Sequence, residues 1–123
     1  MIKISKKLLL FFSIATAVIY FASCEKYSYV EEMIIPEDTI FFSKDIQPIF
    51  NAKCASCHNG TIPLDLRAGN SYKVLTEGGF VKLPIEESVL YKYVVVESSH
   101  AAYTSQEEKG KIYAWIDQGA EDN

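Results

Sequence analysis

The spacing of apolar residues beyond position 40 is that of amphipathic helices. Ile46, Ile49 and Phe50 fall at i, i+3 and i+4, which places them on one face of a helix. We therefore expect a first helix over 45–54. Pro48 would then lie in its first turn, where the missing N–H and the fixed backbone angle of proline are tolerated.

Glycines and prolines divide the pattern that follows. A loop is expected over 58–69, because this stretch contains Asn59-Gly60, Pro63 and Gly69. A short helix is predicted over 70–76, since two consecutive glycines at 78–79 would end it.

Another helix is expected after Pro84. Acidic residues in its first turn suit the positive end of a helix dipole. Its inward side would carry Val89, Leu90 and Tyr93. The three valines over 94–96 are compatible with the end of this helix or with a short extended piece, and the pattern leaves both open.

The last helix has the most complete pattern. Thr104, followed three residues later by Glu107, indicates a capping box at its start, and Gly119 is placed to end it. Its apolar face carries Ile112, Trp115 and Ile116. Gly110 lies inside this helix, where glycine costs about 1 kcal/mol relative to alanine. It either permits the close approach of a neighbouring helix or prosthetic group, or is a tolerated weak spot. Together these elements predict an all-α domain.

The first residues of the chain have the pattern of an export signal. Three lysines precede an uncharged apolar run over 8–21, and Ala22 and Ser23 then supply the small residues of a cleavage site before Cys24. A transmembrane helix is the alternative, but the run is shorter than the roughly 20 residues that a spanning helix needs. We expect residues 1–23 to be removed as a signal peptide.

The residues from Phe21 to Cys24 resemble the lipobox of bacterial lipoproteins, with phenylalanine where leucine is usual. The resemblance implies that Cys24 is acylated and anchors the protein to a membrane of the bacterial cell envelope, facing the periplasm or the exterior. Ordinary cleavage that leaves a free Cys24 is the alternative. Residues 24–40 have no clear period, and we expect them to form a flexible tether to a domain over 41–123.

The balance of charge bears on possible partners. The whole chain has 12 basic and 16 acidic side chains, a net charge of −4. Loss of residues 1–23 removes three lysines, which leaves nine basic and sixteen acidic side chains and a net charge of −7. This acidity argues against nucleic acid as a partner and suits steering toward a basic docking patch on a redox partner protein.

Cys54, Cys57 and His58 belong to the pattern Cys-Ala-Ser-Cys-His, the attachment signature of c-type haem. Two thiols three residues apart lie on one side of a helical turn and can reach the two vinyl groups of one porphyrin. The histidine that follows supplies a nitrogen ligand to the iron. A haem would also give an apolar body to a domain that is too small to build a large core from side chains alone.

Two other interpretations of the cysteine pair are open. One is a redox dithiol, which typically lies beside a βαβ pattern, whereas this chain has a helical pattern. The other is a zinc ion bound by Cys54, Cys57, His58 and His100, a ligand set that suits a closed tetrahedral site. In that site the adjacent residues Cys57 and His58 would both have to bind the same ion.

Segments along the whole domain resemble class I cytochrome c domains of the planctomycete type, which occur in exported bacterial proteins. The resemblance is carried by Asp-Ile-Gln-Pro-Ile-Phe over 45–50, Lys-Cys-Ala-Ser-Cys-His over 53–58, Pro-Leu-Asp-Leu-Arg over 63–67, Pro-Ile-Glu-Glu-Ser-Val-Leu-Tyr over 84–91 and Trp-Ile-Asp-Gln-Gly-Ala over 115–120. It implies an all-α fold in which the first and last helices cross beside one covalently attached haem. It also implies Cys54 and Cys57 as attachment sites and His58 as the proximal ligand of the iron.

The chain departs from this family at the distal ligand, which is usually a methionine in a Met-Pro step before the last helix. Residues 98–104 contain neither methionine nor proline, and Met33 is the only methionine beyond residue 23. His100 lies in the right stretch and is our candidate distal ligand. If His100 is a solvated loop residue instead, the iron is five-coordinate. A methionine–histidine pair raises the reduction potential, so its loss is expected to lower it.

These observations predict a membrane-anchored electron-transfer protein and not an enzyme. No Ser/His/Asp set, phosphate-binding loop or paired catalytic carboxylates can be recognised. The alternative is a five-coordinate haem c domain that binds small ligands, as a gas sensor or a weak peroxidase. A third hypothesis is an interaction module with a structural metal and no haem.

Overall fold

The computed structural model describes residues 32–96 and 98–123. The expected signal peptide over 1–23 and the acylation site at Cys24 lie outside the described residues. None of the helices within these two ranges combines the length and the apolar character needed to span a bilayer.

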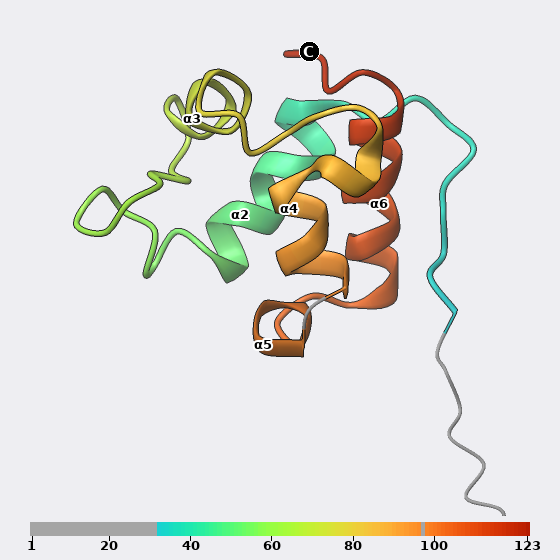
Figure 1. Cartoon of the computed structure of the whole chain (residues 1–123), viewed down its shortest axis with the longest axis horizontal. Helices are drawn as coiled ribbons and strands as arrows, with labels where there is room; N and C mark the ends of the chain where they lie inside the picture. Colours follow the sequence, from blue (N-terminus) through green and yellow to red (C-terminus); the bar gives the residue numbers. More distant parts are fainter. Residues whose placement is uncertain (1–31, 97) are drawn as a thin grey trace, which may run out of the picture. The chain divides into compact units, whose positions relative to one another are not determined.

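Regular structure in the described part of the chain is helical, without strands, which confirms the all-α prediction (Figure 1). The elements are η1 (Phe42–Ile46), α2 (Gln47–Lys53), α3 (Ser71–Glu77), η2 (Ile85–Glu87), α4 (Val89–Tyr91), η3 (Lys92–Val96), α5 (Ser98–Ala101) and α6 (Gln106–Asp117). η1 and η3 have the wide turns of a π-helix, and η2 is a 3₁₀ helix.

The first helix begins earlier than the expected 45–54. Its opening turn is η1, which runs directly into α2, and Pro48 lies in the first turn of α2 as predicted. The carboxylate of Asp45 accepts a hydrogen bond from the backbone N–H of Phe41 at 2.9 Å. This bond satisfies one of the unpaired donors at the start of η1 and gives a physical reason for the earlier beginning.

The short helix predicted over 70–76 is observed as α3, one residue further along. The helix expected after Pro84 is instead broken at Ser88, whose extended backbone separates η2 from α4. The hydroxyl of Ser88 donates to the carbonyl of Phe80 at 3.0 Å, which holds the break in place. Residues 94–96 are helical and belong to η3. Tyr93, expected to face inward, is 45% exposed, so that prediction was wrong.

The capping box of α6 lies one residue beyond the predicted pair of Thr104 and Glu107. Ser105 accepts from the N–H of Glu108 at 3.2 Å, and the Glu108 carboxylate accepts from the N–H of Ser105 at 2.8 Å. The hydroxyl of Thr104 is directed elsewhere, toward the carbonyl of Val94 at 3.2 Å. Of these two adjacent residues with hydroxyl groups, Ser105 caps the helix and Thr104 makes a tertiary contact.

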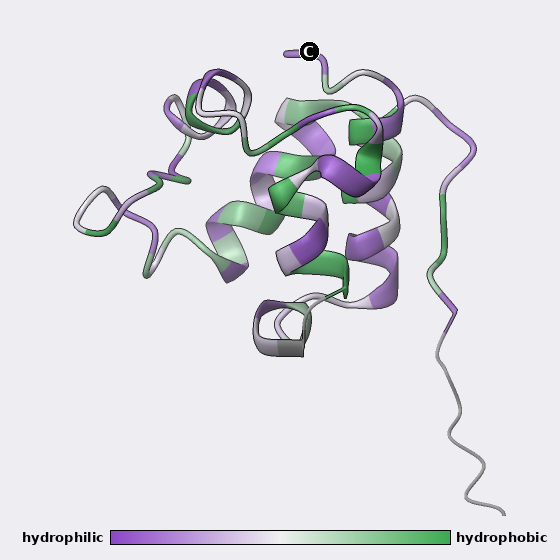
Figure 2. Cartoon of the chain, viewed as in Figure 1, coloured by the Kyte–Doolittle hydropathy of each residue, from purple (hydrophilic) through white to green (hydrophobic). Residues whose placement is uncertain are grey.

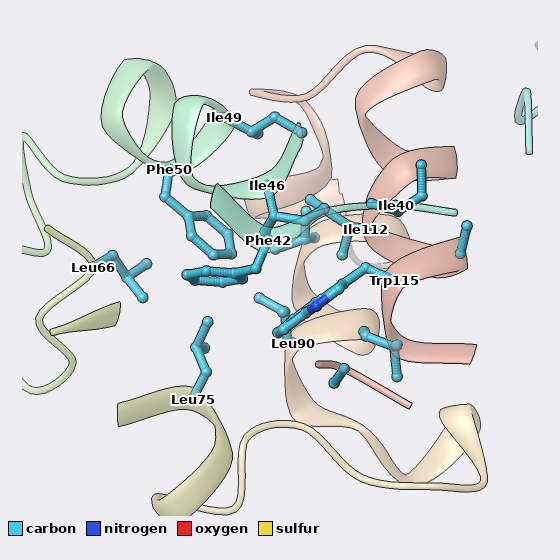
Figure 3. Packing of buried hydrophobic residues seen from close by; sticks show 14 of the residues in the cluster. Ile40, Phe42, Ile46, Ile49, Phe50, Leu66, Leu75, Leu90, Ile112 and Trp115 are labelled. Atoms are coloured by element: carbon cyan, nitrogen blue, oxygen red, sulfur yellow. The ribbon is translucent and has the colours of Figure 1, made fainter. Parts of the chain in front are cut away.

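The hydrophobic core joins η1 to α6. Phe42 packs against Trp115 with ring centroids 5.1 Å apart (Figure 3), and against Tyr72 of α3 with ring centroids 5.2 Å apart. Ile112 and Ile116 are fully buried, which confirms the predicted apolar face of the last helix. Along α6, the apolar residues of the buried face are interspersed with hydrophilic ones (Figure 2).

Residues 34–40, named here the N-terminal segment, belong to the expected tether but follow α6. The carbonyl of Ile34 occupies the space that a β-carbon on Gly110 would need. At the other end of the helix, the N–H of Ile40 donates to Oε1 of Gln118 at 2.9 Å, and Nε2 of Gln118 donates to the carbonyl of Asp38 at 3.1 Å. Gly110 therefore permits a close approach, but the chain's own backbone makes it.

Candidate functional site

The Cys-Ala-Ser-Cys-His pattern forms a tight turn at the end of α2. The carbonyl of Cys54 accepts from the N–H of Cys57 at 3.1 Å and from that of His58 at 2.9 Å. The N–H of Cys54 still donates to the carbonyl of Phe50 at 2.9 Å, so the turn continues from the helix. One turn thus carries both thiols and the imidazole, as the spacing in the sequence requires.

The two thiols differ in their surroundings. Cys54 is half-buried and packs against the apolar core, whereas Cys57 is exposed, and neither is in a disulfide. Burial raises the pKa of the Cys54 thiol to about 11, with further increases from the charge of Glu108 and from Cys57. The thiol is therefore neutral at ordinary pH, in contrast to the lowered pKa that activates a redox dithiol.

One nitrogen of the His58 imidazole has no hydrogen-bonding partner among the described residues. Its Nδ1 is buried and receives no hydrogen bond from the described residues. Its backbone is well held, since the His58 carbonyl accepts from the N–H of Leu66 at 2.8 Å. Buried polar atoms are almost always paired, so this nitrogen marks a bond that the described polypeptide does not supply.

The loop over 58–69 is braced by polar side chains within it and by Asn70, which follows it. Asp65 accepts from Nη2 of Arg67 at 2.6 Å and from Nδ2 of Asn70 at 2.9 Å. These bonds, led by the one from Arg67, hold the pKa of the Asp65 carboxyl well below its usual range. Asn59 likewise accepts from the N–H and the hydroxyl of Thr61. The loop therefore returns to the core in a defined path beside His58.

A buried amide fixes the end of this loop. Nε2 of Gln47 donates to the carbonyl of Leu66 at 3.2 Å, and the hydroxyl of Ser71 donates to Oε1 of Gln47. The side chain on α2 thus joins the end of the loop to the start of α3. Both groups are buried in the core, where hydrogen bonds of this kind fix one arrangement of the chain.

The structure brings His100 close to His58. Their ring centroids are 6.4 Å apart, with 43° between the ring planes. His100 is an exposed residue of α5, a helix of only four residues. Its Nδ1 lies 3.3 Å from the hydroxyl of Ser99. The two histidines singled out from the sequence are therefore neighbours in space, although α3, α4 and η3 separate them along the chain.

Two residues near His100 were not assigned to the site from the sequence. The ring of Tyr93 meets His100 in a T-shaped contact, with centroids 5.6 Å apart and 90° between the planes. Thr104 contacts both η3 and α5 through its hydroxyl. Tyr93 lies seven residues before His100, a spacing that would put both on one face if this stretch formed a single helix. That spacing was the only signal in the sequence that could have indicated the contact between their rings.

Two surface cavities, of about 200 and 340 Å³, lie away from the motif, and none of Cys54, Cys57, His58 or His100 lines either one. Across 32–96 and 98–123, no three or more His, Cys, Asp or Glu side chains are grouped so that they could hold a metal ion.

Comparison of the chain with family models, curated proteins and solved structures gives no match.

Proposed function

We propose that this protein is a membrane-anchored, mono-haem c-type cytochrome that transfers single electrons to and from protein partners outside the cytoplasm. Cys54 and Cys57 would hold the haem covalently, and His58 and His100 would bind its iron. The observation that carries the proposal is the 6.4 Å separation between the rings of His58 and His100, beside a turn that presents both thiols.

The separation of the two rings fits a shared metal ion. A metal–imidazole nitrogen bond is about 2 Å long, and each ring centre lies roughly 1 Å beyond its nitrogen, so two imidazoles that share one ion would have centroids up to about 6 Å apart. The observed 6.4 Å is close to this value. The unpartnered nitrogen of His58 is also compatible with a ring that awaits a further bonding partner.

The surroundings of the thiols suit a large apolar group. Cys54 and Leu64 both pack at the edge of the hydrophobic core, so a group joined to Cys54 would extend that core. The packing of η1 against α6 agrees with a class I cytochrome c arrangement, in which first and last helices meet. These features support the fold assignment that the sequence resemblance suggests.

A bound haem supplies a one-electron redox centre. The residues of the chain would hold and tune it: the two thiols would fix its position, and two histidines in place of a histidine–methionine pair would lower its reduction potential. The net charge of −7 expected after loss of residues 1–23 favours association with a basic patch on a redox partner. Acylation of Cys24 would keep the domain at the membrane of the cell envelope.

Covalent attachment is tested by expressing the full chain together with haem-attachment machinery. Haem is then sought on the protein after denaturing electrophoresis. Wild type and Cys24→Ser should both retain it, whereas the double variant Cys54→Ala/Cys57→Ala should not. A colourless wild type would overturn the assignment and favour the metal-bound interaction module, which a zinc analysis of the same preparation would detect.

The exposure of His100 on a four-residue helix favours one second candidate, a five-coordinate haem c domain that binds small ligands. Carbon monoxide separates the two functions. An electron carrier with both histidines bound should give a sharp low-spin ferrous spectrum that carbon monoxide changes only slowly. A high-spin spectrum that shifts at once would instead support a gas sensor or a weak peroxidase.

A further inference from the structure

Thr104 lies at the junction of the two segments that carry rings of the site. It is 9% exposed, and its hydroxyl lies 3.2 Å from the carbonyl of Val94 and 3.4 Å from that of Ala101. Val94 directly follows Tyr93, and Ala101 directly follows His100. One buried hydroxyl therefore ties η3 to α5 next to both rings.

The position of His100 depends on such ties. A four-residue helix has no stability of its own, because nucleation of a helix is costly and few bonds repay it. Within the described residues, α5 is held by its packing against η3, by the contact with Thr104 and by the N–H of Tyr103, which donates to the carbonyl of His100 at 3.0 Å. The contact between Tyr93 and the imidazole forms only while η3 and α5 stay together.

We infer that Thr104 is a positioning residue for His100, an inference that rests on the proposed function. Its hydroxyl keeps α5 against η3, and this keeps the imidazole beside Tyr93 and within reach of a metal ion bound by His58. Without the hydroxyl, the carbonyls of Val94 and Ala101 lose the single donor that they share, so the arrangement that presents His100 becomes less favourable than its alternatives.

The test uses the haem-loaded full chain and measures how fast carbon monoxide binds to the ferrous protein. An incoming ligand must take the place of His100, so its rate reports how firmly His100 is held. Thr104→Val keeps the shape of the side chain without the donor and should increase the rate by about tenfold. Thr104→Ser keeps the hydroxyl and should bind at the wild-type rate. Thr104→Cys, a weaker donor, should lie between them and provides a readable variant if Thr104→Val does not fold.

A purely structural role is separated by repeating Thr104→Val in a His100→Ala background. If Thr104 acts through His100, the substitution should not change the rate further there. An unchanged rate for Thr104→Val and Thr104→Cys in the wild-type background, or an equal increase in both backgrounds, would overturn the inference and leave the proposed function standing. A wild type without covalent haem, seen before any gas is added, would overturn both.

Discussion

The carbonyl of Ile34 occupies the place where a side chain on Gly110 would begin. The contact joins the start of the described chain to the middle of α6, and the bonds between Gln118 and the N-terminal segment repeat this attachment at the end of the helix. Residues 34–40 are therefore packed along the domain. If Cys24 is acylated, only residues 25–33 remain between the lipid and this contact.

We expect Gly110→Ala to destabilise the protein. Alanine favours a helix by about 1 kcal/mol over glycine, but its β-carbon would collide with backbone, which cannot turn aside as a flexible side chain does. Overpacking of this kind typically costs about 1–3 kcal/mol. Urea unfolding should show a net loss of stability, and limited proteolysis should cut faster within 32–37.

A chain that begins at Pro36 provides the control for this substitution. It lacks the Ile34 carbonyl, so Gly110→Ala should there be neutral or stabilising by up to about 1 kcal/mol. The same loss of stability in the long and short chains would mean that the N-terminal segment does not cause the effect.

The start of α6 gives a second prediction. Ser105→Ala removes the acceptor for the N–H of Glu108 and should lower the free energy of unfolding by about 1 kcal/mol. Glu107→Ala should have a smaller effect, because the ion pair between Glu107 and Lys111 is exposed. Thermal unfolding of the two variants compares them directly. A larger loss of stability for Glu107→Ala than for Ser105→Ala would instead favour the capping box of Thr104 and Glu107 that the sequence predicts.

The loop beside His58 should resist moderate acid. The hydrogen bonds of Asp65, chiefly the one from Arg67, lower the pKa of its carboxyl group in the folded protein. The carboxylate therefore stabilises the loop at pH values above its unfolded pKa of about 4. This stabilisation is lost only as the pH falls through the lower pKa of the folded state. The Nε–H signal of Arg67 in an NMR titration should therefore stay constant to below about pH 4.

Two variants check the origin of this behaviour. Asp65→Asn has no carboxyl to titrate, so its Arg67 signal should differ from wild type at neutral pH and show no acid transition. Asp117→Asn removes an equal charge at an exposed position on α6 and should behave as wild type. A wild-type transition at the ordinary pKa of aspartate would contradict the assigned bonds.

The helical class and much of the helix pattern could be predicted from the sequence. α3 lies within one residue of its prediction, and the apolar face of α6 is buried as its spacing required. The predicted cap of α6 and the predicted inward direction of Tyr93 were both wrong for the same reason. Both depend on the position of η3 in the fold, which the local spacing of residues does not determine. Ser88 broke an expected helix because its hydroxyl bonds to Phe80, eight residues earlier.

The sequence by itself determined that Cys54, Cys57 and His58 lie on one turn, because fixed offsets of one and three residues set their relation wherever the chain turns helically. Only the tertiary structure decided that the ring centroids of His100 and His58 lie 6.4 Å apart and that the hydroxyl of Thr104 ties α5 to η3. Those relations join segments that are separate along the chain, and they exist only once the packing of the core has brought η3, α5 and the end of α2 together.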